Sequence, residues 1–159
     1  MSPTDLTLIV AAGGKSTRMG TDKRFLPLNG ESLLARTLRK GRAAGFRSIV
    51  LAAEGDRSDL TALAEEYGAQ LVTDELPAQG PAAAIAAGLA AAKTEWALVL
   101  SADMPFYDFE LVRALLPEAE GETQVVLPTL LGYWQPLAAL YRRDAGTAFA
   151  AAIAQGDRK

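Results

Sequence analysis

Short runs of β-branched residues and leucine recur along the chain, separated by longer segments with helical spacing. The runs cover residues 6–10, 48–51, 70–72, 96–100, 124–127 and 136–140. Runs this short and this apolar are typical of strands that are buried in a sheet. A strand is therefore predicted at each of the six positions.

Helical periodicity fills the segments between these runs. Apolar stripes of helical spacing are formed by Leu33, Leu34, Thr37 and Leu38, and by Leu60, Leu63 and Ala64. Gly45 and Gly68 follow them as C-terminal stops, and Ser58 is placed to cap the second helix. A third, alanine-rich helix is predicted to begin at Pro81. Its small side chains are interpreted as a packing device that lets the helix lie close to a sheet.

Strands that alternate with helices predict βαβ units. The expected fold is therefore a single α/β domain with a doubly wound, mainly parallel sheet and helices on both faces. In such sheets, ligands bind at the carboxyl ends of the strands. This rule selects the loops at residues 11–23, 73–80 and 101–104 as the functional loops.

Composition restricts the chemistry of these loops. The 159 residues include no cysteine and no histidine, so thiolate and imidazole chemistry is excluded. The net charge is −3 without a basic block, which argues against a nucleic-acid partner. The longest apolar stretch, about 12 residues, is too short to span a bilayer. The first residues, MSPTDL, show no basic region before an apolar stretch, so no signal peptide is expected. A cytoplasmic protein with no membrane partner is expected.

The first loop, AAGGKSTRMGTDK, fits neither of two common phosphate-binding motifs. A P-loop would need a glycine where Ile9 stands, and the dinucleotide pattern does not match glycines at 13, 14 and 20. The small residues Ala11, Ala12, Gly13 and Gly14 nevertheless allow close approach of a ligand to the backbone. Arg18 and Lys23 add cationic donors for a triphosphate. The alternative from the residues alone is a tight strand exit with solvated charges.

The extended motif AAGGKSTRMGTDKRFLPLNG resembles the small nucleotidyltransferases, and among them the molybdenum cofactor guanylyltransferases (the MobA-like family). Two further motifs, TDELPAQGPAAAIAAGL and LVLSADMPF, match in the same order, and QPLAALYRR resembles a later family segment. The resemblance covers nearly the whole chain and implies the Rossmann-like nucleotidyltransferase fold.

The resemblance also implies a reaction. A phosphorylated acceptor of the molybdopterin type attacks the α-phosphate of GTP, pyrophosphate leaves, and GMP is joined to the acceptor. An acceptor phosphate is already ionised near neutral pH, so the missing histidine is no obstacle. Transient contact with proteins that handle the molybdenum cofactor is a further expectation. The alternatives are a cytidylyltransferase of the same cofactor, a sugar-phosphate nucleotidyltransferase, and a non-catalytic nucleotide-binding regulatory module.

Three residues are assigned to catalysis by this resemblance. Asp103 ends a buried strand and matches the family's metal segment, so it is expected to bind Mg²⁺; its alternative role is to cap a helix near Tyr107. Lys23 is expected to contact the triphosphate, and Arg18 the leaving pyrophosphate. For any lysine, the alternative is a solvated surface residue, which is the interpretation for Lys15.

Nucleotide binding is assigned to the ends of two strands and to one helix start. The expected binding residues are Ala11, Ala12, Gly13, Gly14, Lys23, Asp74, Gly80, Pro81 and Asp103. Asp74 has the alternative role of a cap. The chain reads GPAAA where relatives read close to GPLAG, so Ala82 and Ala84 leave recognition of the base open.

Near the end of the chain, Gln135 and Pro136 are expected to border the acceptor site. Trp134 is interpreted as a packing residue rather than a platform for the acceptor. Relatives continue beyond GDRK with a further strand and an asparagine-containing segment. The domain, residues 1–159, is therefore expected to lack that segment, which leaves open whether its metal site is complete.

Overall fold

The computed structural model describes residues 1–13, 22–54, 58–74 and 80–156. In this part of the chain, a central sheet has the strand order β5-β4-β1-β6-β10-β7. Its strands are β1 (Leu6–Ala12), β4 (Ser48–Glu54), β5 (Gln70–Asp74), β6 (Trp96–Ser101), β7 (Val125–Val126) and β10 (Ala138–Arg142). The pairs β1–β4, β1–β6 and β4–β5 are parallel, whereas β10 is antiparallel to both β6 and β7. The prediction of a mainly parallel sheet is confirmed.

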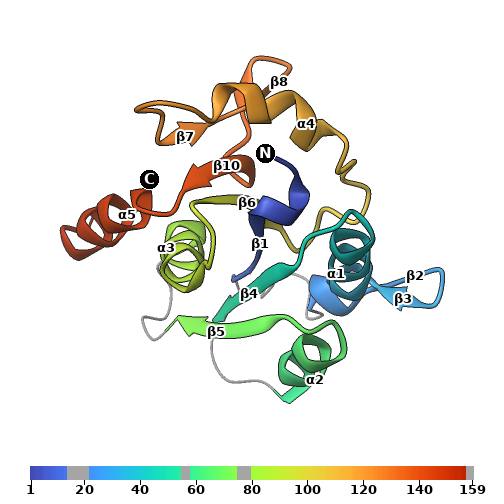
Figure 1. Cartoon of the computed structure of the whole chain (residues 1–159). Helices are drawn as coiled ribbons and strands as arrows, with labels where there is room; N and C mark the ends of the chain where they lie inside the picture. Colours follow the sequence, from blue (N-terminus) through green and yellow to red (C-terminus); the bar gives the residue numbers. More distant parts are fainter. Residues whose placement is uncertain (14–21, 55–57, 75–79, 157–159) are drawn as a thin grey trace.

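Helices cover both faces of this sheet (Figure 1). The α-helices are α1 (Leu33–Ala43), α2 (Ser58–Glu66), α3 (Pro81–Ala91), α4 (Leu111–Leu115) and α5 (Ala145–Ala154). In Figure 1, α1 and α2 lie on one side of the sheet, and α3 and α5 lie on the other. The helices on both faces that the sequence predicts are therefore present.

Smaller elements complete the described chain. The 3-10 helices are η1 (Pro3–Asp5), η2 (Lys23–Phe25) and η3 (Leu116–Glu118). Two short hairpins are formed by β2 (Pro27–Leu28) with β3 (Glu31–Ser32), and by β8 (Thr129–Leu130) with β9 (Tyr133–Trp134). None of the described helices has the length and apolarity to cross a membrane.

Strand β1 supplies side chains to two separate core clusters, because successive side chains of a strand point to opposite faces. Leu8 and Val10 pack with Leu34 and Leu38 of α1 in one cluster. Ile9 belongs to the other cluster, which includes residues of α3. All of these side chains are fully buried. The sheet is thus fixed between two apolar layers, and this fixes the position of its carboxyl edge.

Helix α3 approaches the sheet very closely. At Gly88, an added β-carbon would lie 2.4 Å from Cγ2 of Ile9, a distance that no real side chain tolerates. Ala84 and Leu89 of the same helix are also buried. The predicted role of the alanine-rich helix as a packing device is confirmed.

The helices begin and end at the predicted residues, except that the start of α2 differs by one residue. Gly45 and Gly68 have φ of +100° and +61°, the left-handed conformation in which glycine ends helices. Pro81 is in the first turn of α3, as expected. Ser58 is the first residue of α2 rather than the residue before it.

Candidate functional site

The carboxyl ends of β1 and β6 meet at one edge of the sheet. Ala11 is paired with Ser101 in the parallel register. The backbone N–H of Ala102 donates to the carbonyl of Ala11 at 3.0 Å, which extends this contact past the end of β6. The short alanine side chains at the end of β1 are buried, whereas Gly13 is exposed. Gly13, which follows the end of β1, therefore lies near the turn that carries Asp103. The next question is whether Lys23 lies at the same edge.

Lys23 does return to the edge, because its neighbour Arg24 is bound there. The Arg24 guanidinium donates through Nη1 to the carbonyl of Ala12, the last residue of β1. Its Nε donates to Oδ1 of Asp22 at 2.8 Å, and its Nη2 donates to the other oxygen of the same carboxylate. The backbone N–H of Arg24 also donates to Asp22, which caps η2. Arg24 thus connects the turn that carries Lys23 directly to the strand end.

Arg24 and Asp22 are functional candidates that sequence reasoning missed. Arginine next to aspartate in TDKR reads as ordinary surface charge, yet only about 12% of the Arg24 side chain is exposed in the ion pair. The sequence did contain one indication: an arginine guanidinium can bind both oxygens of a carboxylate at once, whereas a lysine ammonium cannot. Neither residue was predicted from its position in the motif.

We expect Arg24→Ala to weaken GTP binding although Arg24 itself is not assigned a ligand contact. Removing the guanidinium deletes its hydrogen bonds to the Asp22 carboxylate and to the Ala12 carbonyl, and so releases the turn that carries Lys23 from the end of β1. We expect a loss of about 1–3 kcal/mol of folding free energy and a rise in Kd for GTP. Calorimetric titration and thermal unfolding measure the two effects. Arg24→Lys should rescue the affinity only in part, since it keeps the charge and loses the fork; an unchanged Kd in Arg24→Ala would contradict the role.

The side chain of Lys23 is exposed, and no hydrogen bond or ion pair joins it to a residue in the described ranges. The structure therefore places its ammonium at the edge of the sheet without a protein partner there. Both the predicted triphosphate contact and the solvated-lysine alternative are compatible with this position, so the role of Lys23 stays a prediction.

Gly13 and the first turns of α3 lie side by side. An added β-carbon at Gly13 would meet Cβ of Ala84 at 3.7 Å, an ordinary contact distance. Packing against the described protein therefore does not require glycine at this position. Ala84 is itself buried, so its side chain is part of the support beneath Gly13.

Helix α3 begins at this edge with uncapped backbone groups. Gly80 has φ of +72°, and among the described residues no side-chain hydrogen bond caps the helix. The first N–H groups of a helix lack partners within the helix and carry a partial positive charge. Gly80 and Pro81 are both exposed. The predicted binding residues at this helix start are thus accessible to an anionic or polar ligand.

Asp103 follows β6 at the same edge and is exposed. Within the described chain, no hydrogen bond or ion pair engages its carboxylate, and the alternative role as a helix cap is wrong. The helix expected near Tyr107 begins at Leu111 instead, and Asp108 accepts the backbone N–H of Glu110 just before it at 3.0 Å. The Asp103 carboxylate is therefore available to a ligand.

Two cations of α1 fix the turn that follows Asp103. Nζ of Lys40 donates to the carbonyl of Tyr107 at 2.6 Å, and Nε of Arg36 donates to the carbonyl of Pro105 at 3.3 Å. Pro105 is buried, and Phe109 packs edge-to-face on Tyr107. The backbone around Asp103 is thus supported from the helix layer.

The remaining predicted site residues are only partly placed. Asp74 ends β5, where its backbone pairs with Glu54, but the description does not extend to its side chain. Arg18 and Gly14 lie outside the described residues, as does Lys15. The structure therefore brings together Ala11, Ala12, Gly13, Lys23 and Asp103 at one edge, with Gly80 and Pro81 beside them.

The β8–β9 hairpin corrects one expectation. Trp134 is 66% exposed and Tyr133 is 75% exposed, so the interpretation of Trp134 as a packing residue is wrong. The physical reason is that the hairpin projects from the sheet, and its two faces find no core to pack against. Just after it, the hydroxyl of Tyr141 donates to the carbonyl of Pro136 at 2.9 Å. Burial raises the pKa of Tyr141 to about 12, so this donor keeps its proton.

The segment that follows the hairpin lies beside the end of β6 because of the register of β10. Ala138 of β10 is paired with Leu100 of β6, and the N–H of Ser101 donates to the carbonyl of Leu137 at 3.1 Å. The segment that contains Gln135 and Pro136 therefore enters the sheet at the edge where β6 ends. This places the predicted acceptor residues on the β6 side of the candidate site.

The described residues contain no cluster of three or more acidic side chains that could hold a metal ion. Of the carboxylates described at this edge, that of Asp22 binds Arg24, and that of Asp103 has no partner among the described residues. A single carboxylate suits Mg²⁺, which is bound by one or two carboxylates and completes its shell with phosphate oxygens and water. The donor set of the described residues therefore fits a metal that arrives with a nucleotide.

Comparison with known proteins gives a consistent result. Residues 8–159 match the family model described as the MobA-like NTP transferase domain. The chain is 34% identical over 139 residues to a "probable molybdenum cofactor guanylyltransferase" of Natronomonas pharaonis, covering 87% of this chain and 68% of that protein. It is 32% identical over 154 residues to the molybdenum cofactor guanylyltransferase of Pseudomonas putida, covering 96% and 78%.

A solved structure agrees with these relatives. The molybdopterin-guanine dinucleotide biosynthesis protein A of Archaeoglobus fulgidus superimposes with a TM-score of 0.79 at 28% sequence identity. The match covers 97% of this chain and 76% of that protein. The similarity thus extends over the whole sheet and not only over its first loop.

Proposed function

Because the chain belongs to the MobA-like NTP transferase family, we propose that it transfers GMP from GTP to the phosphate of molybdopterin and releases pyrophosphate. The relatives named as molybdenum cofactor guanylyltransferases support this enzymatic assignment. One observation in the structure carries it furthest. The end of β1, the start of α3 and the turn that carries Asp103 meet at the carboxyl edge of the sheet, where open α/β sheets bind ligands, and the Asp103 carboxylate has no partner among the described residues.

The reaction is an in-line displacement at the α-phosphorus of GTP. An oxygen of the acceptor phosphate forms the new bond, and the bond to the bridging oxygen of the β-phosphate breaks. The acceptor phosphate is already an anion, so its attack needs no general base. The protein's task is then to align two anions and to stabilise the charge between them. Histidine, which the chain lacks, is not needed for either task.

Each residue at the edge is assigned one part of this task. Gly13, with Ala11 and Ala12 before it, lets the nucleotide approach the backbone of β1 closely. The ammonium of Lys23 binds the triphosphate, held in place by Arg24. Gly80 and Pro81 present the uncapped start of α3 to the nucleotide. The contacts predicted for Arg18 with pyrophosphate, for Gly14 with phosphate and for Asp74 with the nucleotide stay predictions.

Asp103 is assigned to hold Mg²⁺ together with oxygens of the nucleotide. When bound, Mg²⁺ neutralises developing charge on the transferred and leaving phosphates. Its carboxylate is suited to this because it is exposed, has no partner in the described chain, and sits on a turn that α1 fixes. The choice of magnesium over another divalent cation is part of the proposal.

We assign the acceptor to the side of the carboxyl edge that is formed by β6 and β10. Gln135 and Pro136 enter the sheet there, next to the exposed rings of Tyr133 and Trp134. A pterin is planar and polar at its rim, and exposed aromatic side chains offer a face for such a ring. A cytoplasmic location, a single domain and transient contacts with other cofactor proteins stay predictions.

We expect pyrophosphate release from GTP when molybdopterin and Mg²⁺ are both present, and little release from CTP. Gly13 carries no side chain that would narrow the space for a purine, and packing does not require glycine there. A coupled pyrophosphate assay with GTP, CTP, ATP and UTP measures the preference. Each nucleotide is tested with molybdopterin, with a sugar phosphate and without acceptor.

The outcomes of this assay separate the alternatives. Release from CTP alone would replace the assignment with a cytidylyltransferase of the same cofactor. Release with the sugar phosphate alone would move the chain to the sugar-phosphate enzymes. Binding of GTP without release under any condition would leave a nucleotide-binding regulatory module.

A further inference from the structure

A polar hollow of about 290 Å³ lies at the opposite edge of the sheet from the candidate site. Its lining includes Ser48, the first residue of β4, and Gln70, the first residue of β5. Lys93 and Thr94, just before β6, complete this side, and Thr4 and Arg47 form the other end. These residues lie at the amino ends of parallel strands, whereas the candidate site lies at the carboxyl ends. The proposed function uses none of them.

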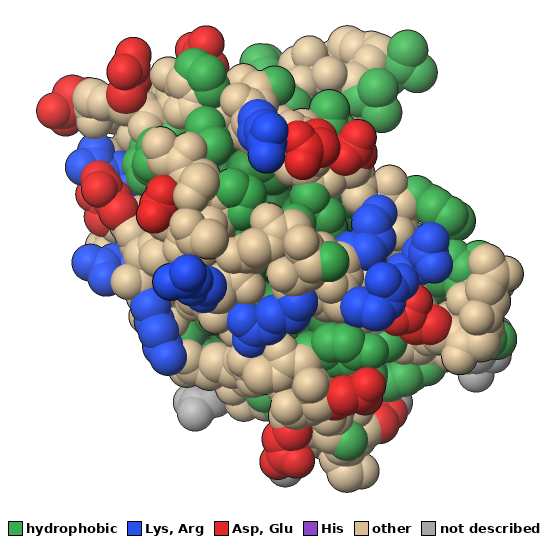
Figure 2. Space-filling model, turned by 45° about the vertical axis from the view of Figure 1, so that its right-hand side comes forward, with side chains coloured by type: hydrophobic (Ala, Val, Ile, Leu, Met, Phe, Trp, Pro, Cys, Tyr) green, Lys and Arg blue, Asp and Glu red, His purple; other side chains and the backbone are tan. Residues whose placement is uncertain are grey.

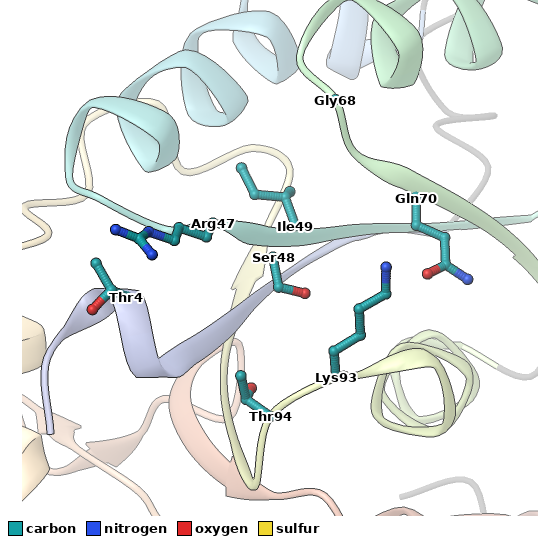
Figure 3. Close-up of a pocket in the computed structure, with 8 residues that line it drawn as sticks. All are labelled: Thr4, Arg47, Ser48, Ile49, Gly68, Gln70, Lys93 and Thr94. Atoms are coloured by element: carbon teal, nitrogen blue, oxygen red, sulfur yellow. The ribbon is translucent and has the colours of Figure 1, made fainter.

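Hydrogen-bond donors line both ends of this hollow. Figure 3 shows the end of the Lys93 side chain between the Ser48 hydroxyl and the Gln70 amide, while the Arg47 guanidinium extends toward Thr4. An ammonium has three donors and no acceptor, and an amide nitrogen has two donors. None of the residues that line the hollow is acidic. The hollow therefore presents positive charge and donors to whatever enters it.

A buried hydroxyl network lies beneath the hollow. The side chain of Thr7 is fully buried, and its hydroxyl lies 3.2 Å from Oγ of Ser48 and 2.7 Å from the hydroxyl of Thr94. Thr7 accepts the backbone N–H of Lys93 at 3.3 Å, and Thr94 donates to the carbonyl of Trp96 at 2.7 Å. Because Thr94 gives its proton to that carbonyl, Thr7 gives its single proton to Thr94, and the hydroxyl of Ser48 completes the network at the wall of the hollow. The same network ties the backbone of Lys93 to the strand.

The two cations of the hollow differ from other cations of the protein. Figure 2 shows many Lys and Arg side chains across one face. Those of α1 are already engaged: Arg39 pairs with Glu31, and Arg42 donates to the carbonyls of Tyr67 and Gly68. Arg47 and Lys93 form no ion pair with a residue of the described ranges. The charge of Lys93 is therefore available to a ligand, whereas the charge of Arg47 also acts on the nearby Asp5 carboxylate, whose pKa is lowered first by hydrogen bonds from Ser2 and in smaller part by Arg47.

We propose that this hollow is a second binding site, for a small phosphate anion. Its lining combines positive charge with donors from three strand starts, the combination that binds phosphate oxygens. Its volume is at the lower end of the range for ligand pockets, about 300–1,000 Å³. The site therefore suits inorganic phosphate, pyrophosphate or a phosphorylated small metabolite, and not a whole nucleotide with its acceptor. This inference does not depend on the proposed reaction.

Amide NMR on the full chain tests the site. We expect titration with inorganic phosphate, at constant ionic strength, to shift the amide signals of Ser48, Gln70 and Thr94 in a saturable way. Lys93→Gln should raise the Kd about tenfold or more, since a charge-assisted hydrogen bond is lost. Lys93 is exposed, so the fold should persist, and the dispersion of the remaining signals checks this. Arg113→Gln, at an exposed cation paired with Glu110 elsewhere, should leave the Kd unchanged.

Two further titrations separate this site from the candidate active site and identify which kind of phosphate it binds. Pyrophosphate is a product of the proposed reaction, so its titration is repeated on Lys23→Ala, in which the hollow signals should still saturate. Tighter binding of ribose 5-phosphate than of inorganic phosphate would assign the site to a phosphorylated metabolite, and the reverse to the free anion. The proposal is overturned if the hollow signals do not saturate, if Lys93→Gln leaves the Kd unchanged, or if Lys23→Ala abolishes the effect.

Discussion

Asp103→Asn is expected to keep the fold and to lower kcat about a thousandfold or more at saturating Mg²⁺. The carboxylate has no partner in the described chain, so its neutralisation removes no internal contact there. What is lost is charge at the proposed metal, and several kcal/mol of transition-state stabilisation correspond to a rate factor of this order. Single-turnover release of pyrophosphate measures the rate, and thermal unfolding checks the fold.

A matched control for this substitution lies in the same loop. Asp108→Asn neutralises a second exposed carboxylate, five positions along the chain, while its side-chain oxygen remains able to accept the N–H of Glu110. We expect its kcat to stay within about twofold of the parent value, an estimate based on the small cost of most surface substitutions. If Asp103→Asn also retained near-normal kcat, the assignment of Asp103 to the metal would be wrong.

Lys23→Ala is expected to weaken GTP binding by roughly 10- to 150-fold with little change in Tm. A hydrogen bond between an ammonium and a phosphate contributes about 1.5–3 kcal/mol, which converts to this range of affinity. The side chain is exposed and has no partner among the described residues, so folding should not depend on it. Calorimetric titration with GTP and Mg²⁺ gives the Kd directly.

Comparison with a second cation makes this result specific. Arg113→Ala also removes one exposed positive charge, but from α4, and should leave the affinity for GTP unchanged. Equal affinity in Lys23→Ala and the parent would return Lys23 to the role of a solvated lysine. Equal losses in both variants would indicate a long-range effect of net charge rather than a contact.

The positions of the main strands and helices, and the apolar core that they form, were accessible from the sequence because they depend on local patterns. The apolar runs at residues 6–10 and 96–100 became β1 and β6, and Gly45 and Pro81 marked helix ends as expected. Hydrophobic periodicity and the conformational limits of glycine and proline act over a few residues, so they can be read without knowing the fold. The ordered motifs on the strand ends then gave the family.

Tertiary structure alone decided which charged side chains are bound and which are free. Arg24 reads like Lys23 in the sequence, yet Arg24 binds the end of β1 and Lys23 has no partner in the described ranges. Trp134 reads as a core residue, yet the hairpin that carries it projects from the sheet. Lys93 meets Ser48 and Gln70 only because the parallel register brings three strand starts together. Such contacts join residues far apart in the chain, and their energy depends on distance and burial, which no local pattern encodes.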